Sequence, residues 1–138
     1  MYKGKRKDNG EWVKGWFIGV GEYSYIVQRA SCYYQNPTAI YLQEHFEVIP
    51  ETVGQFTGLK DNKDTGEELY HKDIVWVTKH YMGDSFCPAQ IGVIEWVDDG
   101  WTVVNKDGDY LCELWDYTYN YCGGKRGTIH SNPELLNA

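Results

Sequence analysis

The sequence has no run of about 18 apolar residues, the length that a helix needs to cross a bilayer, so it predicts no membrane-spanning helix. Its first residues also lack the apolar core of a signal peptide, and we expect a cytoplasmic protein. Cysteine is scarce, with four residues: Cys32, Cys87, Cys112 and Cys122. Because structural disulfides are rare in a reducing compartment, we expect free and mostly buried thiols.

Metal and cofactor motifs are missing as well. Zinc sites usually show paired ligands at short spacing, but the closest pair of ligand types here, His80 and Cys87, is seven residues apart. Gly19-Val20-Gly21 lacks the third glycine and the following helix of a dinucleotide loop. Residues 61–66 resemble a calcium loop, but Lys63 and Thr65 occupy ligand positions. We therefore expect no metal and no cofactor, with the remaining histidines and cysteines as surface imidazoles and buried thiols: His45, His71, Cys112, Cys122 and His130.

Basic residues are few and unevenly placed. The chain has 13 basic and 20 acidic residues, a net charge of −7. Four of the basic ones lie within the first seven residues, so residues 8–138 hold 9 basic and 20 acidic residues, a net of −11. This body would repel phosphates, which opposes nucleic-acid binding. The basic start could be a small phosphate-binding arm, but the pattern favours a solvated terminus: Lys3, Lys5, Arg6 and Lys7.

Aromatic residues, in contrast, are abundant, with 6 Trp, 12 Tyr and 4 Phe. At ~150 to 250 Å² each, they exceed what one small core readily encloses, so several are expected at the surface. Two Tyr-rich pieces look less regular than the strands around them and are the candidate interaction surface: Tyr33, Tyr34, Tyr117, Tyr119 and Tyr121. We expect a homo-oligomer, most simply a dimer, or a complex with a host protein.

β-Branched and aromatic residues between frequent turn residues predict an all-β fold. Asp98-Asp99-Gly100 is a strong hairpin signal, since an Asp-Gly pair supplies the positive φ that a tight turn requires. Residues 82–88 are expected to form a loop, and Asn132-Pro133 to begin one helical turn. The expected strands are residues 11–19, 23–28, 39–43, 46–49, 55–57, 73–78, 89–97, 101–105, 110–115 and 127–130.

Residues 50–59, 69–75 and 132–136 resemble the signature of the YopX-like phage and prophage protein family. The resemblance implies a C-terminal small barrel of the SH3 type over residues 51–138, preceded by a smaller β-rich part over residues 1–50. It also implies a bacterial or phage source, and it brings no catalytic residue. Family members carry Glu-Gly-Asp where this chain has His71-Lys72-Asp73, and Asp64-Thr65 is an insertion. Four residues of the signature are expected to fill the barrel core: Leu59, Leu69, Ile74 and Val75.

These features favour a small, non-enzymatic interaction protein that self-associates or binds a host protein. One alternative is an enzyme built on carboxylates or on Cys87. A third class is a small-barrel module that binds nucleic acid through aromatic platforms. An acidic string could instead mimic nucleic-acid charge, although most of its members flank turns: Glu95, Asp98, Asp99, Asp107, Asp109, Glu113 and Asp116.

Overall fold

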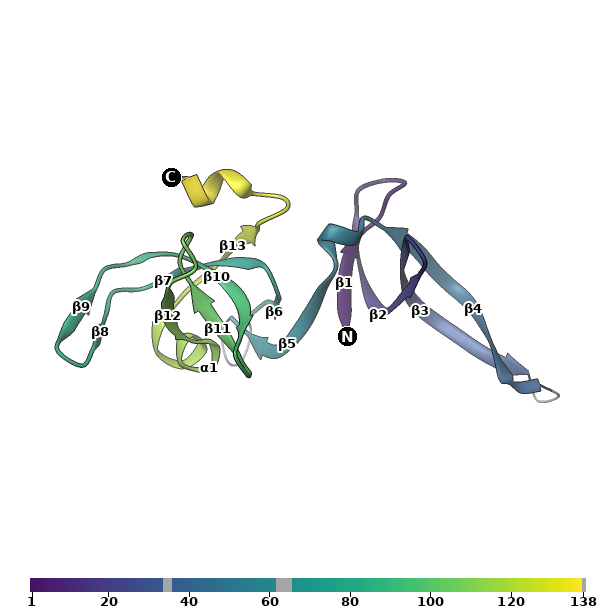
Figure 1. Cartoon of the computed structure of the whole chain (residues 1–138), viewed down its shortest axis with the longest axis horizontal. Helices are drawn as coiled ribbons and strands as arrows, with labels where there is room; N and C mark the ends of the chain where they lie inside the picture. Colours follow the sequence, from purple (N-terminus) through teal and green to yellow (C-terminus); the bar gives the residue numbers. More distant parts are fainter. Residues whose placement is uncertain (34–35, 62–65, 138) are drawn as a thin grey trace. The chain divides into compact units, whose positions relative to one another are not determined.

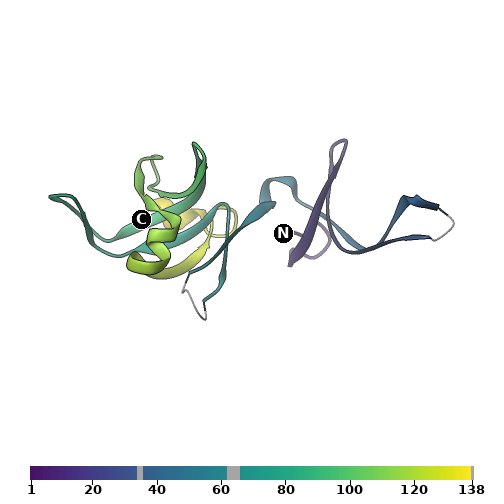
Figure 2. The same cartoon turned by 90° about the horizontal axis from the view of Figure 1, so that it is seen from below.

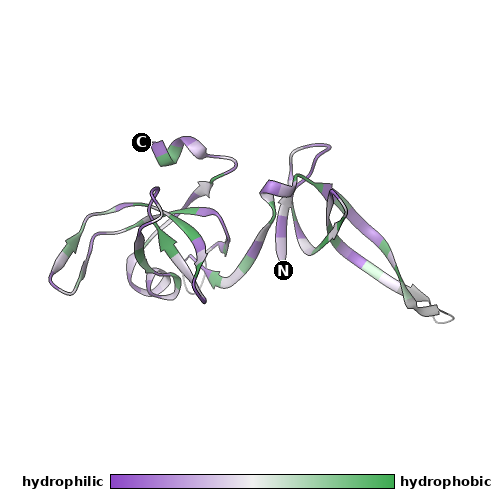
Figure 3. Ribbon diagram, viewed as in Figure 1, coloured by the Kyte–Doolittle hydropathy of each residue, from purple (hydrophilic) through white to green (hydrophobic). Residues whose placement is uncertain are grey.

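A computed structural model describes residues 1–33, 36–61 and 66–137, with residues 32, 33 and 36–38 described as backbone (Figure 1). The all-β prediction is confirmed, because antiparallel strands dominate. Within these described residues none of the sheets closes into a barrel. Figure 3 shows green apolar and purple polar stretches following one another along the strands. The strands are β1 (Tyr2–Lys5), β2 (Trp12–Val20), β3 (Tyr23–Tyr33), β4 (Asn36–Val48), β5 (Gly54–Lys60), β6 (Glu68–Tyr70), β7 (Asp73–Val77), β8 (His80–Met82), β9 (Ser85–Cys87), β10 (Gln90–Val97), β11 (Gly100–Val104), β12 (Tyr110–Glu113) and β13 (Cys122–Thr128).

Helical pieces are short. A 3₁₀ turn, η1 (Pro50–Thr52), precedes β5, and another, η3 (Pro133–Asn137), lies near the C-terminus at the expected helical turn. Between β12 and β13 the chain forms α1 (Leu114–Asp116), which continues as one π-helical stretch, η2 (Tyr117–Tyr121). The chain divides into two compact units, Met1–Gln55 and Phe56–Ala138, whereas the sequence placed the boundary after residue 50.

The first unit is an antiparallel sheet in the order β4-β3-β2-β1, with the start of β5 beside β1. The Gly19-Val20-Gly21 segment belongs to the β2–β3 hairpin, where Val20 pairs with Tyr23 and Gly21 takes φ +59°. A left-handed φ costs glycine nothing, which is why the tight turn falls there. The two pieces predicted at 39–43 and 46–49 are a single strand, β4, whose pairing with β3 is interrupted by bulges.

The basic N-terminus is part of this sheet and not a solvated tail, which corrects the expectation from sequence. Lys3 in β1 is only 6% exposed, and its ammonium lies 5.0 Å from the centre of the Trp12 ring. Arg6 pairs with Asp8 at 2.6 Å, and the Arg6 guanidinium also covers Phe46. Aromatic rings and carboxylates of the same unit therefore hold these cations in place. A cation positioned above the face of an aromatic ring is attracted by it.

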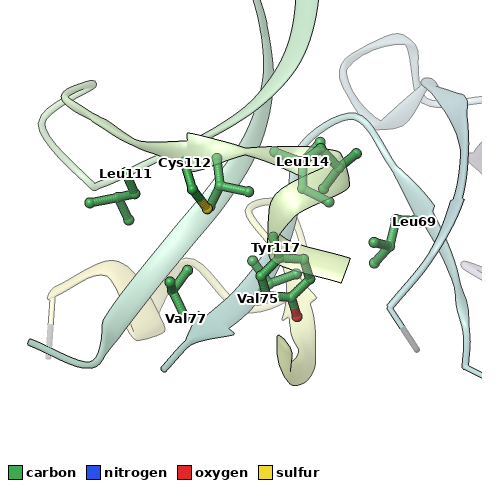
Figure 4. Packing of buried hydrophobic residues seen from close by; sticks show 9 residues of the cluster. Leu69, Val75, Val77, Leu111, Cys112, Leu114 and Tyr117 are labelled. Atoms are coloured by element: carbon green, nitrogen blue, oxygen red, sulfur yellow. The ribbon is translucent and has the colours of Figure 1, made fainter. Parts of the chain in front are cut away.

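The second unit contains a five-stranded antiparallel sheet in the order β12-β11-β10-β7-β13, together with the β5–β6 pair and the β8–β9 hairpin. Side chains from β6, β7, β10, β11, β12 and the helical segment converge in one core (Figure 4). The family signature supplies two members of this core, Leu69 and Val75, and the partly buried Leu59 packs against it from β5. Ile74 is also fully buried, next to Val75 in β7. These expected core positions are confirmed.

The turn between β6 and β7 has an unusual conformation. Lys72 takes φ +74°, the left-handed region that L-residues avoid. Its N–H donates to the carbonyl of Ile94 at 2.8 Å, and its carbonyl accepts from the N–H of Ile129 at 3.1 Å. Next to it, the fully buried Asp73 accepts a hydrogen bond from the Tyr70 N–H and pairs with Lys125 at 3.2 Å. The turn therefore joins β10 and the segment after β13 to the signature motif.

One local prediction was wrong, and a second was right about the β10–β11 hairpin but not about which residue takes the positive φ. Residues 82–88, expected to be a loop, contribute to the β8–β9 hairpin, which closes through Gly83 at φ +63°. In the Asp98-Asp99-Gly100 turn the positive φ falls on Asp98, at +57°, because Gly100 already pairs with Val97 as the first residue of β11.

Candidate functional site

Exposed apolar side chains of the second unit lie at the end of β10, where Trp96 and Val97 are exposed, and on the β8–β9 hairpin, β12 and the helical segment after it. The hairpin extends away from the rest of the unit in both views (Figures 1 and 2). Its exposed ring pair, Tyr81 and Phe86, packs edge to face with centroids 5.4 Å apart. We call the following residues the aromatic surface: Tyr81, Met82, Phe86, Tyr110, Trp115 and Tyr119.

The helical segment separates the predicted tyrosines. Leu114, Tyr117 and Thr118 are buried, whereas Trp115 and Tyr119 are 57% and 61% exposed. Trp115 and Tyr119 are four residues apart and therefore share one side of a helical turn. Tyr117 faces the core, where its hydroxyl lies 3.6 Å from the Cys122 thiol, so its predicted place at the surface is corrected (Figure 4).

The other members of the predicted surface have different outcomes. Tyr119 is exposed and Tyr121 is half-buried at the edge of the core. Tyr33 ends β3, but its side chain lies outside the described residues, as does the whole of Tyr34. The aromatic surface of the second unit thus keeps one predicted exposed tyrosine and adds residues that sequence reasoning missed.

A hollow of about 490 Å³ lies at the base of the hairpin, between β8, β12 and the helical segment. The segment 80–83 forms one wall, and residues 110–112 of β12 form another. Asp116 and Tyr121 complete the lining from the helical turns. Three elements that are far apart in the sequence therefore meet around one cavity whose rim includes Tyr81, Met82 and Tyr110 of the aromatic surface.

His80 is the most constrained residue of this hollow. It is 6% exposed, and its ring stacks on Tyr121 with centroids 4.3 Å apart and planes 29° apart. Its Nδ1 lies 3.0 Å from the Thr78 carbonyl oxygen, which can only accept, so Nδ1 carries the proton of the neutral ring. Nε2 then presents a lone pair, and no hydrogen-bond partner meets it within the described residues.

The hollow has a negative electrostatic environment. Burial first, and then the neighbouring Asp116 and Glu113 carboxylates, together raise the pKa of the Cys112 thiol to about 12. The pKa values of Tyr110 and Tyr121 are raised by burial first, and Asp116 contributes to both. Asp116 accepts a hydrogen bond at Oδ1 from the Asn120 side chain, at 2.6 Å. The groups that line the hollow therefore disfavour additional negative charge.

Ligand-type residues elsewhere do not form a metal centre: in residues 1–33, 36–61 and 66–137, no group of three or more could hold an ion. His71 Nε2 lies 2.7 Å from Glu95 Oε2, and the His71 ring packs against Trp101. The Cys122 thiol contacts the backbone carbonyl of Asp61. Of the acidic string, Asp107 and Asp109 donate backbone N–H groups to the Asn105 side chain in a turn. Of this string, the structure thus brings Glu95 into contact with His71.

Comparison with known proteins adds the following findings. A family model described as YopX protein matches residues 2–137, which extends the similarity over the N-terminal unit that the recognised motifs did not cover. Neither the curated proteins nor the solved structures gave a match. In the described part of the chain, no helix is both long enough and apolar enough to span a bilayer.

Proposed function

The chain belongs to the YopX protein family, and we propose that it is a non-enzymatic, phage- or prophage-encoded interaction protein that binds other protein chains through the aromatic surface. The observation that carries this proposal is the exposure of six large apolar side chains on neighbouring elements of one unit. Three of the six, Tyr81, Met82 and Tyr110, meet at one hollow, and Phe86 packs against Tyr81. Exposed apolar patches usually mark an interface, and tyrosine and tryptophan are the residues that interfaces favour.

The geometry of the hairpin supports this role. Tyr81 and Phe86 sit on facing strands of a two-stranded ribbon, where the hairpin partner alone cannot cover both rings. Two-stranded ribbons are marginally stable in water by themselves, so burial against a second protein surface would stabilise this one. The simplest binding partner for the hairpin is a second copy of the chain, since symmetric dimers are the commonest soluble assemblies. The alternative binding partner is a host protein in the bacterial cytoplasm.

We also propose that the second unit is a small barrel of the SH3 type. Support comes from the strand order β12-β11-β10-β7-β13, in which the last strand returns beside the first after a helical turn. This connectivity, with the fifth strand next to the first and a helical turn before it, is that of SH3-type barrels. Fold analogy identifies no ligand, so the interaction role depends on the aromatic surface and not on the barrel.

Light scattering on the purified chain at high micromolar concentration tests the proposal. We expect a dimer mass for the native chain and a monomer mass for the Tyr81→Ser, Phe86→Ser double variant. Trp16→Ser is the matched control, because Trp16 is 64% exposed but belongs to the first unit. A monomer mass for the native chain would exclude self-association. Binding to a host protein would then remain, and a pull-down with the same variants tests it. If the double variant keeps both the dimer and every captured partner, the proposal is wrong.

Mimicry of nucleic-acid charge is the second candidate, and one observation favours it. Residues 1–55 hold six basic and six acidic residues, whereas residues 56–138 hold seven basic and fourteen acidic ones. The whole net charge of −7 is therefore carried by the second unit. A mimic should displace DNA from a DNA-binding host protein, and its effect should fall steeply as salt rises.

A further inference from the structure

The hollow at the base of the β8–β9 hairpin combines acceptors with aromatic walls. Its lining includes the rings of Tyr81, Tyr110 and Tyr121, the Asp116 carboxylate and the buried His80 imidazole. Among the described residues that line it there is no lysine or arginine. Aromatic faces attract cations, and a carboxylate beside them adds direct charge attraction. The chemistry of the lining therefore matches a cationic ligand.

Two acceptors line this hollow. His80 Nε2 is buried and has no hydrogen-bond partner among the described residues, whereas the half-exposed Asp116 carboxylate accepts a hydrogen bond at Oδ1 from Asn120. Leaving a buried acceptor unpaired is costly, so an incoming N–H donor gains more from His80 than from an acceptor that water already satisfies. A ligand with several N–H donors could serve both acceptors.

We propose that this hollow binds an arginine side chain of a partner protein, with the guanidinium stacked on the tyrosine rings and hydrogen-bonded to Asp116 and His80. Guanidinium carries five N–H donors in a planar fork and stacks on aromatic faces, whereas the lysine ammonium is a compact and strongly hydrated charge. The inference rests on the proposed function, because the rim of the hollow is part of the aromatic surface: Tyr81, Met82 and Tyr110.

The electrostatics of the second unit agree with this ligand. Asp116 raises the pKa of three groups that line the hollow, Cys112, Tyr110 and Tyr121, in addition to the effect of burial. A field that opposes loss of a proton from these groups also attracts a cation. The surplus of seven acidic over basic residues in residues 56–138 would draw a basic partner toward the same unit.

Nuclear magnetic resonance of the full chain provides the test, with N-acetyl-arginine amide as the probe. We expect saturable shifts of the His80 ring nitrogens and of the Tyr121 and Asp116 amides. N-acetyl-citrulline amide has nearly the same shape without the charge, and we expect it to bind at least about tenfold more weakly. N-acetyl-lysine amide should also bind more weakly than the arginine probe. Equal affinity for citrulline, or for lysine, would overturn the inference.

Variants separate binding from folding. Asp116→Asn removes the charge at a half-exposed position and should weaken arginine binding about fivefold or more, with the amide spectrum otherwise preserved. Asp99→Asn is the matched control, since this exposed acidic residue lies in the β10–β11 turn away from the lining. His80→Phe keeps a stacking ring without Nε2, and Asp116→Asn decides alone if that variant fails to fold. Unchanged affinity in Asp116→Asn would refute the site.

Failure of this inference is distinguishable from failure of the proposed function. If no arginine probe binds while the Tyr81→Ser, Phe86→Ser variant still loses its dimer or its partner, the hollow is not an arginine site and the aromatic surface remains an interface. If arginine binds and competes with the captured partner, both are supported, and the partner presents its arginine to this hollow.

Discussion

Replacing Lys72 by glycine should stabilise the protein, against the usual trend for glycine substitutions. Lys72 takes φ +74° in the turn between β6 and β7, where the Cβ of an L-residue crowds the backbone. Both backbone hydrogen bonds of this residue, to Ile94 and from Ile129, involve groups that glycine retains. The substitution therefore removes strain without removing these contacts.

The magnitude follows from two opposing terms. A left-handed conformation costs an ordinary residue about 1–2 kcal/mol. Glycine costs about 0.5–1 kcal/mol through the greater freedom of the unfolded chain. The net gain should be about 0.5–1 kcal/mol, which corresponds to a rise in Tm of roughly 2–5 °C for a protein of this size. Lys72→Ala keeps the Cβ and should give no such gain.

Scanning calorimetry of the full chain is the assay, with Lys106→Gly as the matched control. Lys106 is exposed in the β11–β12 turn and is not among the positive-φ residues, so its replacement should leave Tm unchanged or lower it. The reasoning is refuted if Lys72→Gly lowers Tm, or if Lys72→Ala raises it equally. In the latter case the gain would come from loss of the lysine side chain and not from relief of the backbone.

Four further outcomes are expected. Gly92→Ala should destabilise the second unit by about 1–3 kcal/mol in urea titrations, because the new Cβ would lie 2.4 Å from a Val103 methyl carbon; Gly100→Ala, with only a 3.8 Å contact, should be nearly neutral. Burial holds the pKa of Cys112 at about 12, so its thiol stays protonated at pH 8, and mass spectrometry should find it alkylated far more slowly in the native than in the urea-unfolded chain. Tight binding to duplex DNA is not expected at physiological salt in a mobility assay, and any low-salt binding should vanish when Lys5 and Lys7 are replaced by glutamine; a micromolar affinity that survives this change would contradict the charge argument. Elemental analysis should find no stoichiometric zinc, and chelators should leave Tm unchanged, whereas about one zinc per chain would contradict the absence of short-spaced ligand pairs.

The features that the sequence predicted correctly depend on local chemistry. Alternating apolar residues and turn formers located most strands, because a strand buries one face and a turn needs particular φ values over a few residues. The signature residues Leu69, Ile74 and Val75 entered the core as expected. Lys72 shows where local chemistry is overridden, since a lysine holds a left-handed turn once its backbone groups bond to Ile94 and Ile129.

Features that depend on distant partners were missed. Four basic residues near the start indicated a solvated terminus. In the structure β1 pairs with β2 and β5, and the Lys3 ammonium lies over the Trp12 ring. The His80 hollow was not foreseeable either, because it is formed by β8, β12 and the helical segment together. Burial of a charged or polar side chain is decided by such tertiary contacts, which spacing along the chain does not reveal.

The helical segment shows how the local periodicity determines which tyrosines are exposed. We group Tyr117, Tyr119 and Tyr121 as one candidate surface from sequence because the piece that holds them looks less regular than the strands around it. The segment is helical instead, so Tyr117 joins Leu114 and Thr118 in the buried set, while Tyr119 lies with Trp115 outside. Positions 114, 117, 118 and 121 follow the i, i+3, i+4, i+7 pattern of an amphipathic helix, and this signal was present in the sequence. Asp116 precedes Tyr121 by five residues, which is the hydrogen-bond spacing of a π-helix. The observed π-helical winding, and not the 3.6-residue pattern, therefore brings both residues to the hollow where the proposed arginine site is found.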